Sequence, residues 1–175
     1  MKALRIIGGI LLILLAIFFI GGTLLPKTYT IHRSTLINAT DSVVYMNVAD
    51  LNNFLKWNPW TKMEPSAKVT ISGTTAQPGH LWEWLGKETG QGQMELITAK
   101  PYSLLEFELK FFEPFESSAI SFFNFEQTNE GTKVTWGLQG EAKNMGDRWM
   151  GLFMDMMMDK DFNNGLQSLK ELSEK

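Results

Sequence analysis

The sequence contains no cysteine, which excludes disulfide bridges, thiolate nucleophiles, cysteine-ligated zinc and iron–sulfur clusters. Histidine is scarce as well: His32 and His80 are the only two, so a histidine-rich metal site is not expected. Basic residues are outnumbered, because 16 Lys and Arg stand against 19 Asp and Glu, giving a formal net charge of −3. A nucleic-acid-binding protein needs a basic face, so this class is disfavoured. The glycines form no GxGxxG or Walker loop, and no nucleotide or other cofactor is expected.

Charge is absent altogether from the segment Ile6 to Leu25. A helix of this length, about 20 residues, spans about 30 Å, the hydrocarbon thickness of a bilayer. The pattern predicts an uncleaved transmembrane anchor over residues 1–26 and one domain over residues 27–175. A cleaved signal peptide is the alternative, although it requires a shorter apolar region and an A-x-A-like cleavage site.

The charges beside this apolar segment indicate its orientation. Lys2, Arg5 and the terminal amine precede it, and Lys27 and Arg33 follow it, which slightly favours a cytoplasmic N-terminus and an exported domain. Without Lys2 and Arg5, 14 of the 16 cations remain against 19 anions, so the domain carries −5. Attraction to an anionic leaflet therefore does not assist the domain, and any lipid contact would have to be apolar.

Alternation of apolar and polar residues predicts strands along most of the domain. The expected strands are 27–38, 68–72, 80–87, 93–99, 104–112, 117–127 and 132–140. Two short helices, capped by Thr40 or Asp41 and by Asp50, fill the gap after the first strand, and Pro59 ends the second. Short turns between consecutive strands imply an antiparallel meander. One long helix, about 147–172, completes an α+β order.

The apolar residues of this last helix do not keep to one face. Trp149, Leu152, Phe153 and Met156 form one line, and Met158, Phe162, Leu166 and Leu169 form another, rotated by more than 90°. Either the helix bends near residues 159–161, or its first half is apolar nearly all round. The second arrangement would leave Met150, Met154 and Met157 on a partly exposed edge.

Several short strings occur in a recognisable order. They are Thr30-x-x-Arg33-Ser34-x-x-Ile37-Asn38-Ala39, Trp57-x-Pro59-Trp60, Gly79 with Trp84-x-Gly86 and Gly90-x-Gly92, Gly131-Thr132-Lys133-Val134-Thr135-Trp136, and Gly165-Leu166-x-x-Leu169-Lys170. Together they resemble the START-like, or helix-grip, superfamily, and most closely its bacterial SRPBCC group of polyketide cyclase/dehydrase and lipid transport proteins. The resemblance covers residues 28 to 173. It implies a curved sheet wrapped around the C-terminal helix, with a hydrophobic cavity between them. It implies no particular reaction, and no catalytic motif can be transferred.

Apolar side chains facing the helix are the candidate ligand-binding residues. They are Trp82, Trp84, Leu105, Phe107, Leu109, Phe123, Phe125, Trp136, Trp149, Phe153 and Met157. The alternative for each is ordinary packing of a concave sheet. Trp57 and Trp60 flank a turn that the superfamily places near the pocket entrance; alternatively, they pin that loop. The dense methionines at 150, 154 and 156–158 suit an adaptable pocket mouth or a lipid-contacting face, or else simply fill gaps in a packed helix.

The polar residues give weaker indications of a catalytic or metal site. His80 near Trp82 is a candidate general base if it points inward, but no carboxylate or hydroxyl nearby in the sequence would orient it, and an edge histidine beside a turn is the preferred interpretation. Glu83, Glu106 and Glu108 alternate with the apolar set and are expected on the solvated face. Asp155, Asp159 and Asp161 are expected on different faces of the helix and lack the loop spacing of a calcium site, so no metal is expected.

The sequence thus favours a membrane-anchored carrier or sensor that binds a hydrophobic small molecule or lipid between sheet and helix. Its partners are that ligand and the membrane. A cyclase or dehydratase on the same fold is the first alternative, and it requires a polar residue of perturbed pKa inside the cavity. A protein-interaction module that uses the methionine-rich helix is the second.

Overall fold

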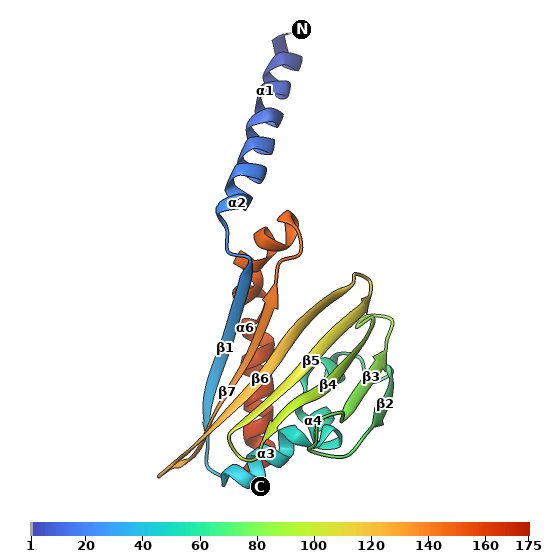
Figure 1. The fold of residues 1–175 in the computed structure, drawn as a ribbon, viewed down its shortest axis with the longest axis vertical. Coiled ribbons are helices and arrows are strands. Elements are labelled where there is room, and N and C mark those ends of the chain that lie inside the picture. Colours follow the sequence, from blue (N-terminus) through green and yellow to red (C-terminus); the bar gives the residue numbers. More distant parts are fainter. Residues whose placement is uncertain (1) are drawn as a thin grey trace.

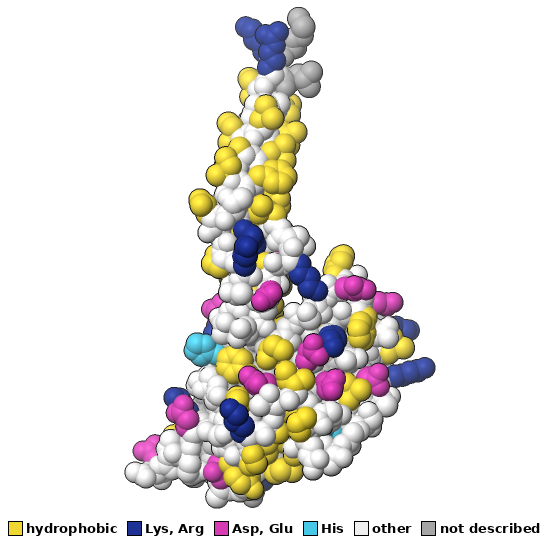
Figure 2. Space-filling view, viewed as in Figure 1, with side chains coloured by type: hydrophobic (Ala, Val, Ile, Leu, Met, Phe, Trp, Pro, Cys, Tyr) yellow, Lys and Arg dark blue, Asp and Glu magenta, His cyan; other side chains and the backbone are white. Residues whose placement is uncertain are grey.

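The computed structural model describes residues 2–175, and Figure 1 shows a slender helix standing on a compact domain. The slender part consists of α1 (Lys2–Ala16), a π-helical turn η1 (Ile17–Gly21) and α2 (Gly22–Leu24). Its segment Arg5–Leu24 is long and apolar enough to cross a membrane, with a mean hydropathy of 2.6. Figure 2 shows apolar side chains along the visible face of this part and basic side chains at its far tip.

The domain is one antiparallel sheet with helices on its concave face. Its elements, in chain order, are β1 (Thr28–Ile37), α3 (Asp41–Ala49), α4 (Leu51–Trp57), α5 (Pro59–Met63), β2 (Lys68–Ser72), β3 (Leu81–Leu85), β4 (Gln91–Lys100), β5 (Leu104–Glu113), β6 (Ser117–Thr128), β7 (Gly131–Glu141) and α6 (Met145–Ser173). The seven strands are ordered β1-β7-β6-β5-β4-β3-β2, so the expected meander is confirmed, and β1 closes it beside β7.

Two local predictions differ from the structure. Pro59 ends α4 as expected, but it also begins α5, because the Asn58 side chain accepts a hydrogen bond from the backbone N–H of Trp60. Proline in the first helical turn after an asparagine cap is a strong start signal, so a third short helix stands where a plain turn was expected. The last helix begins at Met145 rather than near 147, because Asn144 and Asp147 form a capping box.

Strand register defines two ends of the domain. Thr28 pairs with Glu141 where the apolar helix joins the domain, and we call this the anchor end. The pair Leu109 and Ala119 lies toward the same end of the sheet. Ile37 pairs with Thr132 at the opposite, far end. Helix α6 begins at the anchor end and runs to the far end across the concave face, as Figure 1 shows.

Helix α6 is continuous from Met145 to Ser173, and the exposure of its first half agrees with the second of the two expected arrangements. Its second half is buried through Phe162, Leu166 and Leu169. None of the residues from 145 to 158 is fully buried, and Met150 and Met157 are each 52% exposed. The first half is therefore apolar without being part of the core.

Candidate functional site

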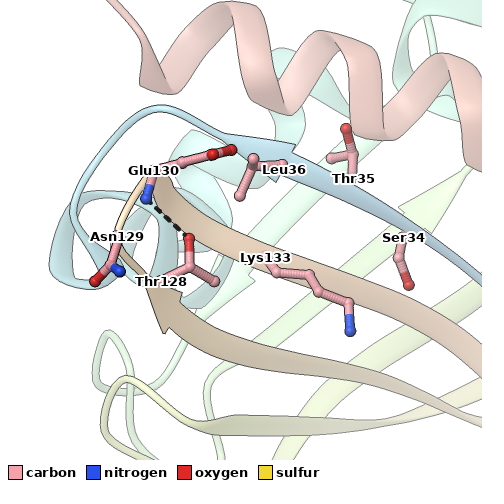
Figure 3. A pocket seen from close by; sticks show the side chains of 7 residues that line it. All are labelled: Ser34, Thr35, Leu36, Thr128, Asn129, Glu130 and Lys133. Atoms are coloured by element: carbon pink, nitrogen blue, oxygen red, sulfur yellow. Dashed lines mark hydrogen bonds between the residues drawn. The ribbon is translucent and has the colours of Figure 1, made fainter.

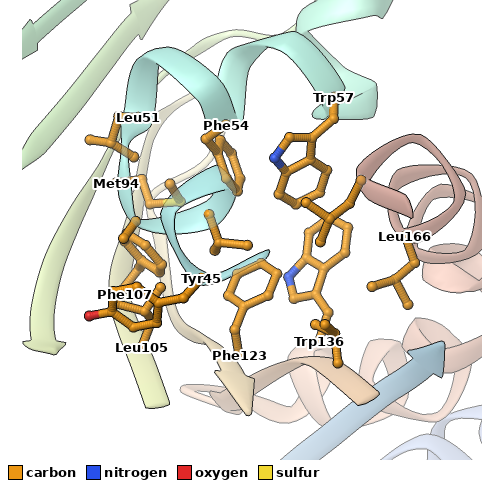
Figure 4. Packing of buried hydrophobic residues seen from close by; sticks show 14 of the residues in the cluster. Tyr45, Leu51, Phe54, Trp57, Met94, Leu105, Phe107, Phe123, Trp136 and Leu166 are labelled. Atoms are coloured by element: carbon orange, nitrogen blue, oxygen red, sulfur yellow. The ribbon is translucent and has the colours of Figure 1, made fainter. Parts of the chain in front are cut away.

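The space between the sheet and the helices is filled by aromatic rings over its far and central parts (Figure 4). The Trp136 indole stacks on Phe162 with ring centroids 4.3 Å apart and planes 5° from parallel. On its other side it stacks on Phe123 at 5.3 Å, and Trp57 meets it edge-on at 5.5 Å. This packing differs from the expected hollow along the whole sheet–helix interface, because four rings from β6, β7, α4 and α6 occupy the same space.

The predicted ligand-binding residues divide along the length of the domain. Leu105, Phe107 and Phe123 have no exposed surface, and Trp136 and Phe125 are 2% and 5% exposed. These side chains are enclosed by other side chains, as the core-packing alternative predicts.

Nearer the anchor end the same face becomes more accessible. Trp82 and Trp84 are 7% and 8% exposed, and Leu109 is only partly buried. Met154 and Met158 of α6 are also partly buried. Several inner side chains are thus less buried at the end where the apolar helix joins the domain.

The three α6 candidates lie outside the packed interior. Phe153 and Met157 are 50% and 52% exposed, and Trp149 is half-buried against the foot of the apolar helix. The Trp149 indole Nε1–H donates to the backbone oxygen of Phe18 at 3.1 Å. These residues therefore share the anchor end with Trp84 and Leu109 but not the interior with Phe123.

The two predicted entrance residues have different environments. Trp57 is 1% exposed, and its Nε1–H donates to the backbone oxygen of Asn47 at 2.8 Å, so it belongs to the core. Trp60 is partly buried and meets Trp136 edge-on at 5.9 Å. The alternative of a loop pinned by two aromatics describes this geometry.

Polar groups on the concave face are few. His80 is 1% exposed, which is more buried than an edge position predicts, and its Nδ1 lies 3.2 Å from the backbone oxygen of Ala49. Ser121 Oγ accepts a hydrogen bond from the Trp136 indole at 3.1 Å. The Trp82 indole nitrogen is buried and has no hydrogen-bond partner among the described residues. A buried donor without an acceptor is costly, so Trp82 offers a bond to any oxygen that enters this region.

Two polar features were missed at the sequence level. The Glu64 carboxylate after α5 accepts hydrogen bonds from the backbone N–H groups of Lys87, Glu88 and Thr89 and from the Thr89 hydroxyl. These bonds, led by the one from the Thr89 N–H, lower the pKa of Glu64 to about 2. Glu64 therefore fixes the β3–β4 turn, which lies at the anchor end.

The second missed feature joins β1 to α6. Arg33 contacts Asp155 at 2.8 Å and Asp159 at 2.7 Å, and these bonds raise the pKa of Arg33 and lower that of Asp155. The two aspartates share a face, contrary to expectation, because residues four apart in a helix are neighbours. The signal was present in the sequence: Arg33 alternates in phase with Tyr29 and Ile31, which places it on the inner face of β1.

Two surface hollows stand out among the described residues, and neither lies between the sheet and the second half of α6. One, of about 520 Å³, is an open groove formed by β1, the β6–β7 turn and Lys133 (Figure 3). The other, of about 220 Å³, lies at the anchor end between the start of β1 and the first turns of α6. Tyr29 lines this second hollow, and burial together with the charge of Asp147 raises its pKa.

The chain belongs to the polyketide cyclase / dehydrase and lipid transport family, whose model matches residues 28–174. This result confirms the resemblance to the SRPBCC group and the helix-grip fold. The family has ligand-binding capacity, and its description names both enzymes and lipid transport. No curated protein matches the sequence.

Solved structures share the fold at low sequence identity. A protein of unknown function from Staphylococcus aureus superposes with a TM-score of 0.65 at 10% identity, covering 85% of this chain and 94% of its own. A protein from Chromobacterium violaceum gives 0.57 at 16% identity, covering 86% and 99%. StfQ, a di-domain ARO/CYC protein from the steffimycin biosynthetic pathway, gives 0.61 at 9% identity, covering 85% of this chain and 51% of its own. At these identities the comparisons show a common fold.

Proposed function

We propose that this protein is a membrane-anchored binding protein for a hydrophobic small molecule or lipid, and that the ligand enters at the anchor end. The observation that carries this proposal is the gradient of burial along the concave face. Leu105 and Phe107 in the middle of the sheet have no exposed surface, whereas the anchor end has partly buried apolar side chains on both the sheet and α6. The ligand would complete the core at this end.

The proposed binding region consists of four apolar side chains and one donor. Leu109 and Trp84 provide the sheet wall, Met154 and Met157 provide the helix wall, and the Trp82 N–H is available for a ligand oxygen. Methionine is flexible and polarisable, so this wall can adapt to ligands of different shape. Affinity would come mainly from apolar burial, at about 25 cal/mol per Å² removed from water.

The apolar helix supports a membrane location. Arg5–Leu24 has the length and composition of a span, and it joins the domain at the end where the side chains are least buried. Hydrophobic molecules concentrate in the bilayer, so an opening at this end faces the ligand's reservoir. The slight excess of positive charge before the span favours a cytoplasmic N-terminus and an exported domain.

An enzymatic function has less support from the residues on the concave face. Among the described residues, the buried polar groups His80 and Ser121 are hydrogen-bonded to Ala49 and Trp136, and neither is paired with a carboxylate. The cyclase alternative therefore depends on the family description and on fold similarity to StfQ, and fold alone does not determine chemistry.

Substituting the helix wall tests the proposal. The full chain in detergent is titrated with a fluorescent long-chain fatty acid, and the double variant Met154→Gln/Met157→Gln is compared with wild type. Loss of two apolar contacts should weaken binding by about tenfold. Met46→Gln is the matched control, because Met46 is a partly exposed methionine on α3, away from the anchor end. Equal affinity of the double variant and wild type would refute the proposed wall, and saturable binding by none of the three would refute the binding function.

A further inference from the structure

The start of α6 is fastened to the foot of the apolar helix by several specific contacts. Trp149 donates its indole hydrogen to the Phe18 carbonyl, and its ring stacks on that of Phe18 at 6.3 Å with planes 14° apart. The Arg148 guanidinium donates to the Gly22 carbonyl at 3.1 Å. Gly22 packs so closely on Met145 that a Cβ there would overlap the methionine sulfur. The start of α6 therefore packs closely against the end of the apolar helix and is hydrogen-bonded to it.

The next turns of α6 form a surface that we call the lipid-facing segment, residues 150–157. Apart from Met157, which is assigned above to the proposed ligand wall, its exposed large apolar side chains are Met150, Leu152, Phe153 and Met156. Each is at least 50% exposed, and Met156 is 72% exposed. At 100° per residue they span an arc of about 160° on the side of α6 opposite its buried residues, and the partly buried Met154 and Met158 lie on the other side. A helix that is apolar nearly all round is ordinarily buried in protein or in a membrane, and this one is not buried in protein.

Charged groups at the start of α6 are directed away from this surface or neutralised. Asp147 accepts from the backbone N–H groups of Lys143 and Asn144, and Arg148 binds the end of the apolar helix. Asp155, the one charge within the lipid-facing segment, is paired with Arg33. Unpaired charge returns at Lys160 and Asp161, immediately after the segment ends.

We infer that residues 150–157 of α6 lie in the membrane interface, among the lipid headgroups and upper acyl chains of the leaflet where the apolar span ends. This inference rests on the anchoring half of the proposed function. Phe18 precedes Leu24 by six residues, a rise of about 9 Å, so the Trp149 indole that contacts it reaches into the apolar layer. From Trp149 to Met157 the helix advances about 12 Å, which is enough to cross the upper acyl chains and the headgroup region of one leaflet, the latter about 5 to 7.5 Å thick. Tryptophan is the residue enriched at this depth.

Because the chain has no cysteine, single labelling sites can be introduced directly. Met156→Cys places an environment-sensitive NBD fluorophore on the outward side of the lipid-facing segment. Asn163→Cys is the matched control, because it is also exposed, lies on nearly the same side of α6 and is seven residues, about 10.5 Å, further from the anchor. Each labelled full-length chain is reconstituted as a single copy in nanodiscs of phosphatidylcholine and phosphatidylglycerol. Quenching is measured with lipids that carry a spin label near the headgroup.

The inference predicts blue-shifted emission at position 156 and several-fold stronger quenching by the labelled lipid there than at position 163. Equal, weak quenching at both positions would overturn it. A blue shift at 156 without lipid quenching would overturn it as well, since the segment would then be covered by protein. Flotation of the full chain with vesicles tests the membrane anchor separately. A chain that floats but shows no quenching at position 156 would support the anchor and refute the interfacial position of residues 150–157. A chain that does not float would refute both.

Discussion

At the scale of single residues, Glu64 carries the clearest electrostatic signature in the domain. Four donors from the β3–β4 turn converge on its carboxylate, and they lower its pKa from 4.5 to about 2. A carboxyl whose folded-state pKa lies below its unfolded value stabilises the fold above the unfolded pKa. That contribution disappears as the pH falls through the window from about 4.5 to about 2.

The change Glu64→Gln should therefore lower the melting temperature at pH 7, since the neutral amide accepts these bonds less strongly and places an NH2 group near N–H donors. The pKa of Glu64 is 4.5 in the unfolded chain and about 2 in the folded one. As the pH falls through this range, the wild-type melting temperature should therefore decrease more steeply than that of the variant. Thermal unfolding followed by circular dichroism at several pH values measures both effects. Glu130→Gln, in the exposed β6–β7 turn, is the control. Parallel pH profiles for wild type and Glu64→Gln would contradict the assignment.

At the scale of elements, the first half of α6 is held to the sheet by polar contacts rather than by buried apolar ones. Its second half packs on Trp136 through Phe162 and on the core through Leu166 and Leu169. The first half depends on Arg33, which bridges β1 to Asp155 and Asp159. The two halves should accordingly differ in local stability, since segments with few buried contacts open at lower free energy.

Replacing Arg33 by Gln should release the first half selectively. Hydrogen exchange of the full chain, read by mass spectrometry, should become faster over residues 147–158 and stay unchanged over residues 162–173. Lys133→Gln, which removes the exposed pair with Glu126 on β7 and β6, should leave both segments unchanged. Uniform acceleration along the whole helix would show that Arg33 supports the fold in general and not this half in particular.

Sequence periodicity anticipated most of these elements, and the reasons for the exceptions are local. Clean alternation in β5, with Leu105 and Phe107 inward, made the strand unmistakable. The helix α5 was missed because Pro59 both ends one helix and begins the next. The resemblance places Trp57 beside a turn near the pocket entrance, and only the tertiary packing of α4 shows that its ring fills the core. Whether the aromatic side chains on the concave face enclose a cavity or stack on one another depends on the distances between sheet and helices, which the alternation of residues along the sequence does not give.

At the scale of the whole molecule, the apolar helix joins the domain at its anchor end (Figure 1), where Trp149 contacts Phe18 and several inner side chains are only partly buried. The far end, by contrast, is closed by Leu169 and the strand ends near Ile37. Under the proposed function, the anchor end is the side of the domain that faces the membrane, and the ligand would occupy only the end that the domain's own side chains leave incomplete.

The most direct measurement is native mass spectrometry of the full chain released from nanodiscs made of native membrane lipids. The account predicts a population that retains one lipid or other hydrophobic molecule at an activation energy that strips away loosely attached lipid. In the double variant Met154→Gln/Met157→Gln this population should shrink, and in Met46→Gln it should remain. A wild-type chain that appears only at its bare mass under those conditions would contradict the account.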